Sequence, residues 1–125
     1  MRSPMLGLRT LIYKVNDLDK AKAWYAEAFQ ISPYFDQPFY VGFNVGGFEL
    51  GLDPDGSREQ NSFSNATAYW GVEHIQQEFE RLIGLGAQSI TAPENVGGEI
   101  VVATVVDPWG NLIGLIYNPE FKTES

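Results

Sequence analysis

The side chains in this sequence that are able to do chemistry are few. The chain has no cysteine, which excludes thiolate nucleophiles and thiolate metal sites, and it has a single histidine, His74. A lone histidine acts as a base only with an orienting partner and a place in a cleft, whereas His74 stands where a predicted helix begins. Asp107 belongs to the turn at 107–111 (DPWGN), where an aspartate accepts backbone N–H bonds. We therefore assign neither residue a catalytic role.

Two acidic stretches are open to more than one interpretation. Glu49 stands in a predicted strand among Phe48, Leu50 and Leu52. If its side chain points into a cleft, apolar surroundings would raise its pKa or pair it with a cationic ligand; if it points outward, it is an ordinary solvated residue. The segment 53–56 (DPDG) hints at a calcium loop, but the third acidic position and the distal glutamate are absent, so we predict a turn.

The composition places limits on the partners of the protein. With 125 residues, of which 44% are hydrophobic and 14% aromatic, the chain is long enough for one packed domain. Its net charge of −8 repels phosphate backbones and mildly favours a cationic or neutral small ligand, although most acidic proteins are simply soluble. No apolar run is long enough to span a bilayer, and no secretory signal is visible. We expect no nucleic-acid or membrane partner and, by default, a cytoplasmic location.

The spacing of apolar residues divides the first half of the chain into a strand, a helix and three strands. Asp17 is a suitable N-cap for the helix, and Gly46-Gly47 predicts a two-residue hairpin turn. The predicted elements are a strand at 6–15, a helix at 18–29 and strands at 34–36, 39–45 and 48–52, with Phe39, Val41, Phe43 and Val45 on the core-facing side.

The second half repeats this order. We predict a strand at 65–72, a helix at 73–85 and strands at 87–91, 99–106 and 112–117. Asp17 and His74 hold matching places before the two helices, 57 residues apart, which indicates an internal duplication. The predicted fold class is α+β, with a single domain over residues 1–125 built from two βαβββ modules at 6–53 and 65–117 and a linker at 54–64.

Three features of the sequence resemble the vicinal oxygen chelate superfamily. They are the segment 15–18 (VNDL) before the first helix, Trp24-Tyr25 within that helix, and the hairpin at 107–113 (DPWGNLI). The superfamily includes glyoxalases, extradiol dioxygenases, fosfomycin-modifying enzymes and bleomycin-binding resistance proteins. The resemblance covers residues 6 to 117 and implies a glyoxalase/bleomycin resistance/dioxygenase-like fold, in which paired modules form curved mixed sheets around a cleft, usually in a homodimer.

The resemblance also implies where a metal would be held. Enzymes of the superfamily hold a divalent ion at the base of the cleft with His, Gln or Glu side chains. Position by position, these ligands fall on Thr10, Thr67 and Gly114, and less directly on Glu49. Threonine hydroxyls are weak ligands and glycine has no side chain, whereas first-row metals favour imidazole and carboxylate. We therefore expect no bound metal and no other cofactor.

The cleft that the resemblance implies is apolar, lined by small residues and ringed by tyrosine. Gly114 is expected to leave a void where a metal ligand would otherwise stand. The predicted ligand-binding residues are Thr10, Ile12, Tyr40, Glu49, Thr67, Tyr69, Leu112, Gly114 and Ile116. We expect a metal-free protein that binds a small organic molecule, cationic or aromatic, as the bleomycin-binding members do. Two alternatives remain open: a glyoxalase- or dioxygenase-like enzyme that uses non-standard residues such as Glu49 and Tyr69, and a regulatory module without a dedicated ligand.

Overall fold

The structure is a computed structural model that describes residues 4, 8–54 and 67–119. The chain divides into two compact units, residues 1–59 and residues 60–125, and each is described by itself. Residues 55–64 of the predicted linker, and residues 6–7 and 65–66 of two predicted strands, lie outside the described residues.

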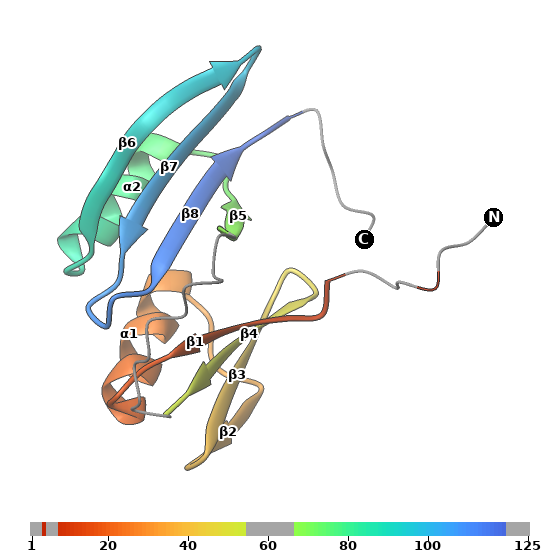
Figure 1. Ribbon diagram of the computed structural model, residues 1–125, viewed down its shortest axis with the longest axis vertical. Coiled ribbons are helices and arrows are strands. Elements are labelled where there is room, and N and C mark those ends of the chain that lie inside the picture. The colour runs from red at the N-terminus through yellow and green to blue at the C-terminus, as the bar shows by residue number, and fades with distance from the viewer. Residues whose placement is uncertain (1–3, 5–7, 55–66, 120–125) are drawn as a thin grey trace. The chain divides into compact units, whose positions relative to one another are not determined.

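The first unit is a four-stranded mixed sheet with one helix (Figure 1). The sheet has the order β1-β4-β3-β2, in which β1 is parallel to β4 and the other neighbours are antiparallel. The elements are β1 (Thr10–Lys14), α1 (Leu18–Phe29), β2 (Phe35–Gln37), β3 (Tyr40–Val45) and β4 (Phe48–Asp53).

Helix α1 forms where its spacing and its cap predict. Asp17 caps it by accepting a hydrogen bond from the Lys20 amide at 3.1 Å, which satisfies one of the free N–H groups of the first turn. Ala21, Tyr25 and Ala28 recur at helical spacing and are buried. This stripe packs against β3 and β4. The predicted helix at 18–29 is confirmed.

The strands of the first unit alternate between a core face and an open face. On β4, Leu50 and Leu52 are fully buried, so Glu49, Gly51 and Asp53 must point to the opposite face. The register of β4 follows from the two-residue turn at Gly46-Gly47, where both glycines adopt positive φ, at 61° and 95°. The turn therefore decides which side chains of β4 are available on the open face.

The second unit repeats the same architecture. Its sheet has the order β5-β8-β7-β6, with β5 parallel to β8 and the other neighbours antiparallel, and α2 packs against β6, β7 and β8. The elements are β5 (Tyr69–Gly71), α2 (Ile75–Gly84), β6 (Gln88–Gly97), β7 (Ile100–Val106) and β8 (Leu112–Tyr117).

Strand β6 is longer than the predicted strand at 87–91. The alternation of apolar and polar residues is hard to follow at Pro93. Proline also has no N–H group to donate to a neighbouring strand. The structure accommodates this proline because β6 pairs only with β7, and the pairing shifts its register between Thr91 and Glu94. An edge strand with a bulge is where proline is tolerated.

The turn between β7 and β8 is built around Asp107. Its buried carboxylate accepts hydrogen bonds from the amides of Trp109, at 2.9 Å, and Asn111, at 2.7 Å, and from the side chain of Asn111 at 3.0 Å. Gly110 adopts a φ of 87°. The predicted turn and the structural role of Asp107 are thus confirmed.

The described residues thus form two four-stranded mixed sheets, each with one helix, in the order βαβββ twice. The predicted α+β class is confirmed. Within the described part of the chain, no helix combines the length and the apolar character needed to cross a membrane.

Candidate ligand-binding site

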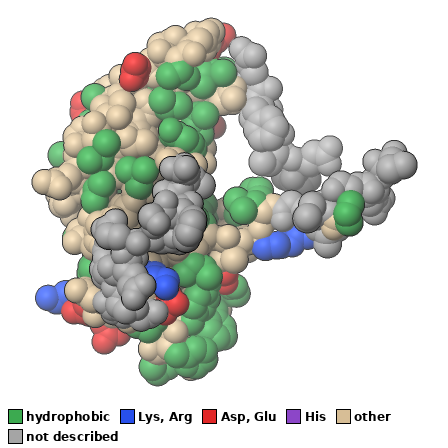
Figure 2. Space-filling view, in the orientation of Figure 1, with side chains coloured by type: hydrophobic (Ala, Val, Ile, Leu, Met, Phe, Trp, Pro, Cys, Tyr) green, Lys and Arg blue, Asp and Glu red, His purple; other side chains and the backbone are tan. Residues whose placement is uncertain are grey.

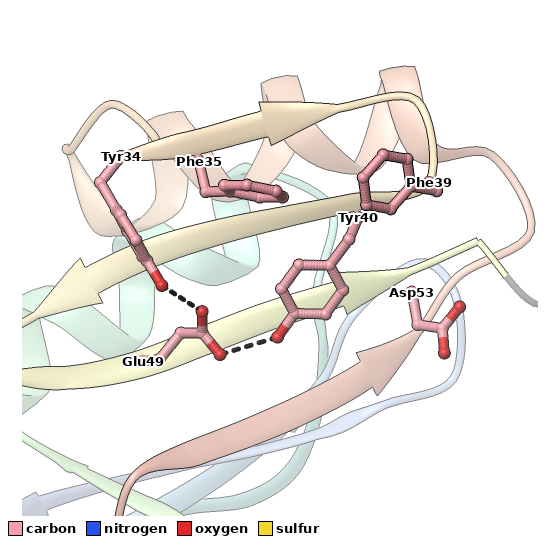
Figure 3. Close-up of a pocket in the computed structure, with 6 residues that line it drawn as sticks. All are labelled: Tyr34, Phe35, Phe39, Tyr40, Glu49 and Asp53. Atoms are coloured by element: carbon pink, nitrogen blue, oxygen red, sulfur yellow. Dashed lines mark hydrogen bonds between the residues drawn. The ribbon is translucent and has the colours of Figure 1, made fainter.

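The site with the most developed chemistry lies on the open face of the first sheet, around the carboxylate of Glu49. Three hydroxyl groups donate to it, and Figure 3 shows two of them, those of Tyr34 and Tyr40. Thr10 Oγ1 lies 2.5 Å and Tyr40 Oη 2.7 Å from Glu49 Oε1, and Tyr34 Oη donates to Oε2. The donors come from β1, from β3 and from the residue just before β2. Glu49 is thus held in one orientation from three sides.

Strand register brings these groups together. Thr10 is the direct partner of Glu49 across the parallel pair β1–β4. Gly42 and Gly51 are direct partners across β3–β4, and they leave the floor of the site without side chains. A Cβ atom at Gly51 would lie 1.8 Å from Tyr40 Oη, and one at Gly42 would lie 2.8 Å from Glu49 Oε2. The two glycines therefore provide the space in which Tyr40 and Glu49 meet.

These hydrogen bonds keep Glu49 ionised. Burial alone would raise the pKa of Glu49, but the hydrogen bonds from Thr10, Tyr34 and Tyr40 lower it by more, so the pKa lies below its ordinary value of 4.5. The carboxylate has the opposite effect on its phenol donors. Its hydrogen bond raises the pKa of Tyr34 above 10.0, and burial together with the same carboxylate raises the pKa of Tyr40. Of the two alternatives for an inward-facing Glu49, the raised pKa is wrong, because the hydroxyl donors outweigh the apolar surroundings, and pairing with a cationic ligand stays a prediction.

Beside this carboxylate is a pocket of about 450 Å³, lined by Tyr34, Phe35, Phe39, Tyr40, Glu49 and Asp53. Its walls are aromatic, and the centroid of the Phe35 ring lies 6.1 Å from that of Phe39 and 6.2 Å from that of Tyr40. Phe39 and Tyr34 remain 66% and 64% exposed. Figure 2 shows hydrophobic side chains gathered on the surface of the part of the molecule that carries β2 and β3. Exposed apolar surface of this kind next to a fixed charge is typical of a binding site.

The structure brings together some of the predicted residues of the first unit and adds others. Thr10, Tyr40 and Glu49 meet as described, while Ile12 lies exposed on the same face of β1 and does not line the pocket. The residues that sequence reasoning missed are Tyr34, Phe35, Phe39 and Asp53.

Phe39 corrects a specific prediction. It was assigned to the core-facing side with Val41 and Phe43, which are indeed buried, but it is exposed. The strand begins at Tyr40, and Phe39 belongs to the turn after β2, where the alternation of a strand does not apply. The alternating pattern at 39–45 runs through Phe39 and therefore does not place it in a turn.

The predicted site residues of the second unit have a different environment. Tyr69 is 45% exposed and its ring lies over Gly114, since a Cβ atom at Gly114 would lie 2.6 Å from both Tyr69 Cδ1 and the carbonyl oxygen of Ala68. The expectation that Gly114 leaves a void is therefore wrong. Thr67 is half-buried just before β5, and Leu112 and Ile116 share the face of β8 opposite the buried Ile113 and Leu115.

The two sheets share one strand register, which shows which positions of the two halves correspond. Val15 and Val72 each lie two residues before the N-cap of a helix. The Val15 amide donates to the carbonyl oxygen of Asp53, and the Val72 amide donates to that of Ile116. Matching the halves at these bonds pairs Thr10 with Thr67, as predicted. Glu49 lies four residues before Asp53, and Leu112 lies four residues before Ile116. Glu49 therefore corresponds to Leu112 and not to Gly114. Gly114 instead corresponds to Gly51, two residues before the same bond.

The residues present do not fit a first-row metal ion. Among the positions at which the resemblance implies ligands, Thr10 and Thr67 offer only hydroxyls and Gly114 offers nothing, and Leu112, which corresponds to Glu49, is apolar. Glu49 already accepts three hydrogen bonds. In the described residues, no group of three histidine, cysteine or acidic side chains is placed to hold a metal. Such an ion normally requires three or four imidazole, thiolate or carboxylate ligands.

His74 lies where the sequence predicts. It is exposed at the N-cap of α2, where its side chain makes no capping hydrogen bond. In this position it lacks the burial that is typical of a catalytic histidine.

Replacing Gly51 with alanine is expected to separate Tyr40 from Glu49 while leaving the unit folded. The new Cβ atom would occupy the present place of Tyr40 Oη, which is the far end of a side chain and can swing away without moving backbone. Tyr40 would then lose burial and its bond to Glu49, so its pKa should fall toward 10.0. A pH titration of tyrosine absorbance measures this change. Gly71→Ala, where an added Cβ atom meets nothing within 4 Å, is the matched control. Identical titrations of Gly51→Ala and the control would contradict the arrangement.

Comparisons with known proteins define the class of the chain. Residues 7–115 match the family model of the glyoxalase/bleomycin resistance protein/dioxygenase superfamily, and the chain belongs to this superfamily. No curated protein matches it. The resemblance drawn from the VNDL segment and the DPWGN hairpin is thereby confirmed.

Solved structures show the same fold at low sequence identity. A glyoxalase-related enzyme from Fulvimarina pelagi aligns with a TM-score of 0.78 and 19% identity, over 97% of this chain and 94% of that one. The fosfomycin resistance protein FosX from Listeria monocytogenes aligns with a TM-score of 0.72 and 20% identity, over 96% of this chain and 97% of that one. TioX from Micromonospora sp. ML1 aligns with a TM-score of 0.71 and 17% identity, over 89% of this chain and 98% of that one.

Proposed function

We propose that this protein is a metal-free binding protein for a small organic cation that carries an aromatic or apolar group, and that the pocket of the first unit is its site. The observation that supports this most directly is the ionised carboxylate of Glu49, fixed by three hydroxyl donors beside a pocket with aromatic walls. The name of the superfamily to which the chain belongs includes bleomycin resistance proteins, which is consistent with a binding function.

The chemistry of the walls suits a positive charge that is weakly hydrated. Cations are attracted to the faces of aromatic rings within about 6 Å, and this attraction adds to that of a carboxylate. Phe35, Phe39, Tyr34 and Tyr40 supply the rings, and Glu49 and Asp53 supply the negative charge. An ammonium group bound there would give up contacts with water and gain contacts with the ring faces and with the Glu49 carboxylate. Because this carboxylate is already fixed by hydrogen bonds, its side chain loses little conformational freedom when the ligand binds.

The same geometry weighs against the alternative of general-base catalysis. A useful general base has a pKa near the working pH. Glu49 has a pKa lowered below 4.5, because its oxygen atoms already accept hydrogen bonds from Thr10, Tyr34 and Tyr40. It is a weak base and a strong point of attraction for a cation, which favours binding over proton abstraction.

The direct test compares a cation with an uncharged ligand of the same shape. Benzyltrimethylammonium and its carbon analogue neopentylbenzene differ only in charge, and their binding can be followed by NMR chemical-shift titration. We expect the cation to bind at least about tenfold more tightly, since cation–π and carboxylate attraction together exceed about 1.4 kcal/mol in a partly desolvated pocket. Equal affinities, or shifts confined to residues outside the pocket, would overturn the proposal.

The pH dependence follows from the direction of the pKa shifts. Benzyltrimethylammonium does not titrate, so any change reports the protein. Because the pKa of Glu49 is lowered, the midpoint of the loss of binding, at which half of the carboxylate is protonated, should lie below pH 4.5. Because the pKa values of Tyr34 and Tyr40 are raised, the hydroxyl donors persist beyond pH 10.0. A midpoint between pH 7 and pH 5 would contradict a lowered pKa for Glu49.

A further inference from the structure

The pocket has a negative group at each end. Glu49 and Asp53 both line it, and both project from the open face of β4 because they lie four positions apart on a strand whose side chains alternate between its two faces. Four residues of strand place their Cα atoms about 13 Å apart. The backbone of Asp53 is fixed by the hydrogen bond from the Val15 amide to its carbonyl oxygen at 2.9 Å. The Cα atoms of the two acidic residues are thus held at a set separation along one strand.

The space between the two carboxylates is bordered mainly by aromatic rings. Gly51 stands midway on β4, where a Cβ atom would lie 1.8 Å from Tyr40 Oη and 2.5 Å from Tyr40 Cζ, and Figure 3 shows the Tyr40 ring between Glu49 and Asp53. The ring of Phe35 lies 6.2 Å from that of Tyr40, and Phe39 adds a further exposed ring. A ligand that reaches from one carboxylate to the other would therefore pass along aromatic surface and bury aliphatic groups there.

From this arrangement we infer that the preferred ligand is a linear dication, with two ammonium groups separated by an apolar spacer that spans Glu49 and Asp53. This inference rests on the proposed function of the pocket and names its ligand class. Binding of the first ammonium group to one carboxylate holds the second near the other, which raises its effective concentration. A spacer that is too short gains nothing from the second charge.

One cationic side chain of the protein bears on this inference. Lys14 is the direct partner of Asp53 across β1–β4, so it projects from the same face beside that carboxylate. Its side chain is exposed. A ligand ammonium group at Asp53 would be repelled by the positive charge of Lys14. Removing the lysine charge should therefore strengthen binding of a dication more than binding of a monocation.

The test uses α,ω-diaminoalkanes of increasing length and the n-alkylamines of the same carbon number, titrated by NMR at constant ionic strength. We expect the diamine to bind more tightly than its matched monoamine by about tenfold once the spacer is long enough to bridge the two carboxylates, and by much less when it is short. A ratio that does not depend on spacer length would overturn the inference, because general attraction to an acidic protein has no such dependence.

Variants assign the second charge to Asp53. Asp53→Asn should abolish the preference for the long diamine and leave monoamine binding within about twofold, whereas Lys14→Gln should increase the preference. Asp19→Asn removes one charge from α1, on the other face of the sheet, and should leave the preference unchanged. A preference retained in Asp53→Asn would overturn the inference. Absence of monoamine binding to the unmodified protein would instead show that the proposed function itself has failed.

Discussion

Replacing Gly114 with leucine is expected to destabilise the second unit by about 3 kcal/mol, because there is no room for a side chain at this position. The first side-chain atom alone would lie 2.6 Å from the carbonyl oxygen of Ala68, which is backbone and cannot rotate away. It would also meet the ring of Tyr69. The Gly114 amide donates to that same carbonyl oxygen at 3.0 Å, so relief of the clash would break a bond that joins β5 to β8.

Urea unfolding monitored by circular dichroism measures this effect. Gly71→Leu is the matched control, because it places the same side chain on β5 at a position where an added Cβ atom meets nothing within 4 Å. The free energy of unfolding of the control should change by less than about 1 kcal/mol. If Gly114→Leu were as stable as the control, a void would exist over Gly114 after all, and the description of the second sheet would be wrong.

Replacing Glu49 with glutamine should weaken binding of benzyltrimethylammonium by about 20-fold, which corresponds to about 1.8 kcal/mol. Glutamine keeps the shape of the side chain but removes the charge, and its NH₂ group faces hydroxyls that previously donated to an oxygen atom. Affinity for neopentylbenzene should not change, since that ligand makes no charge interaction. Asp19→Asn controls for the loss of one negative charge elsewhere in the unit.

A second measurement on Glu49→Gln needs no ligand. The carboxylate raises the pKa values of Tyr34 and Tyr40, so both should fall in the variant, that of Tyr40 only in part because its burial remains. Absorbance titration of tyrosine reports both values. If binding and tyrosine titration were both unchanged in Glu49→Gln, the carboxylate would belong to neither the site nor the hydrogen-bonded cluster.

The fold was predictable because its signals are local. The spacing of α1, the Asp17 cap and the Gly46-Gly47 turn each involve residues within a few positions of one another, and each specifies a definite backbone geometry. The face on which Glu49 lies follows from the burial of Leu50 and Leu52, yet alternation alone left two equally valid choices of face.

The properties of the site were less predictable because they depend on distant contacts. The lowered pKa of Glu49 requires Thr10, 39 residues away in the sequence, together with Tyr34 and Tyr40. The pocket also depends on Phe39, whose place in a turn cannot be seen from an alternating pattern that runs through it. The crowding over Gly114 arises from Tyr69 on another strand. None of these contacts has a local sequence signature.

The register that the two halves share has a consequence for how they are able to diverge. Thr10 and Thr67 hold matching positions, but Glu49 is matched by Leu112, so one half carries a carboxylate where the other carries an apolar side chain. A shift of one residue would turn Ile113 and Leu115 out of the core, so the buried face keeps the register fixed. Leu112 and Ile116 lie on the opposite face of β8, so substitutions there can change the chemistry of one half without repacking its helix.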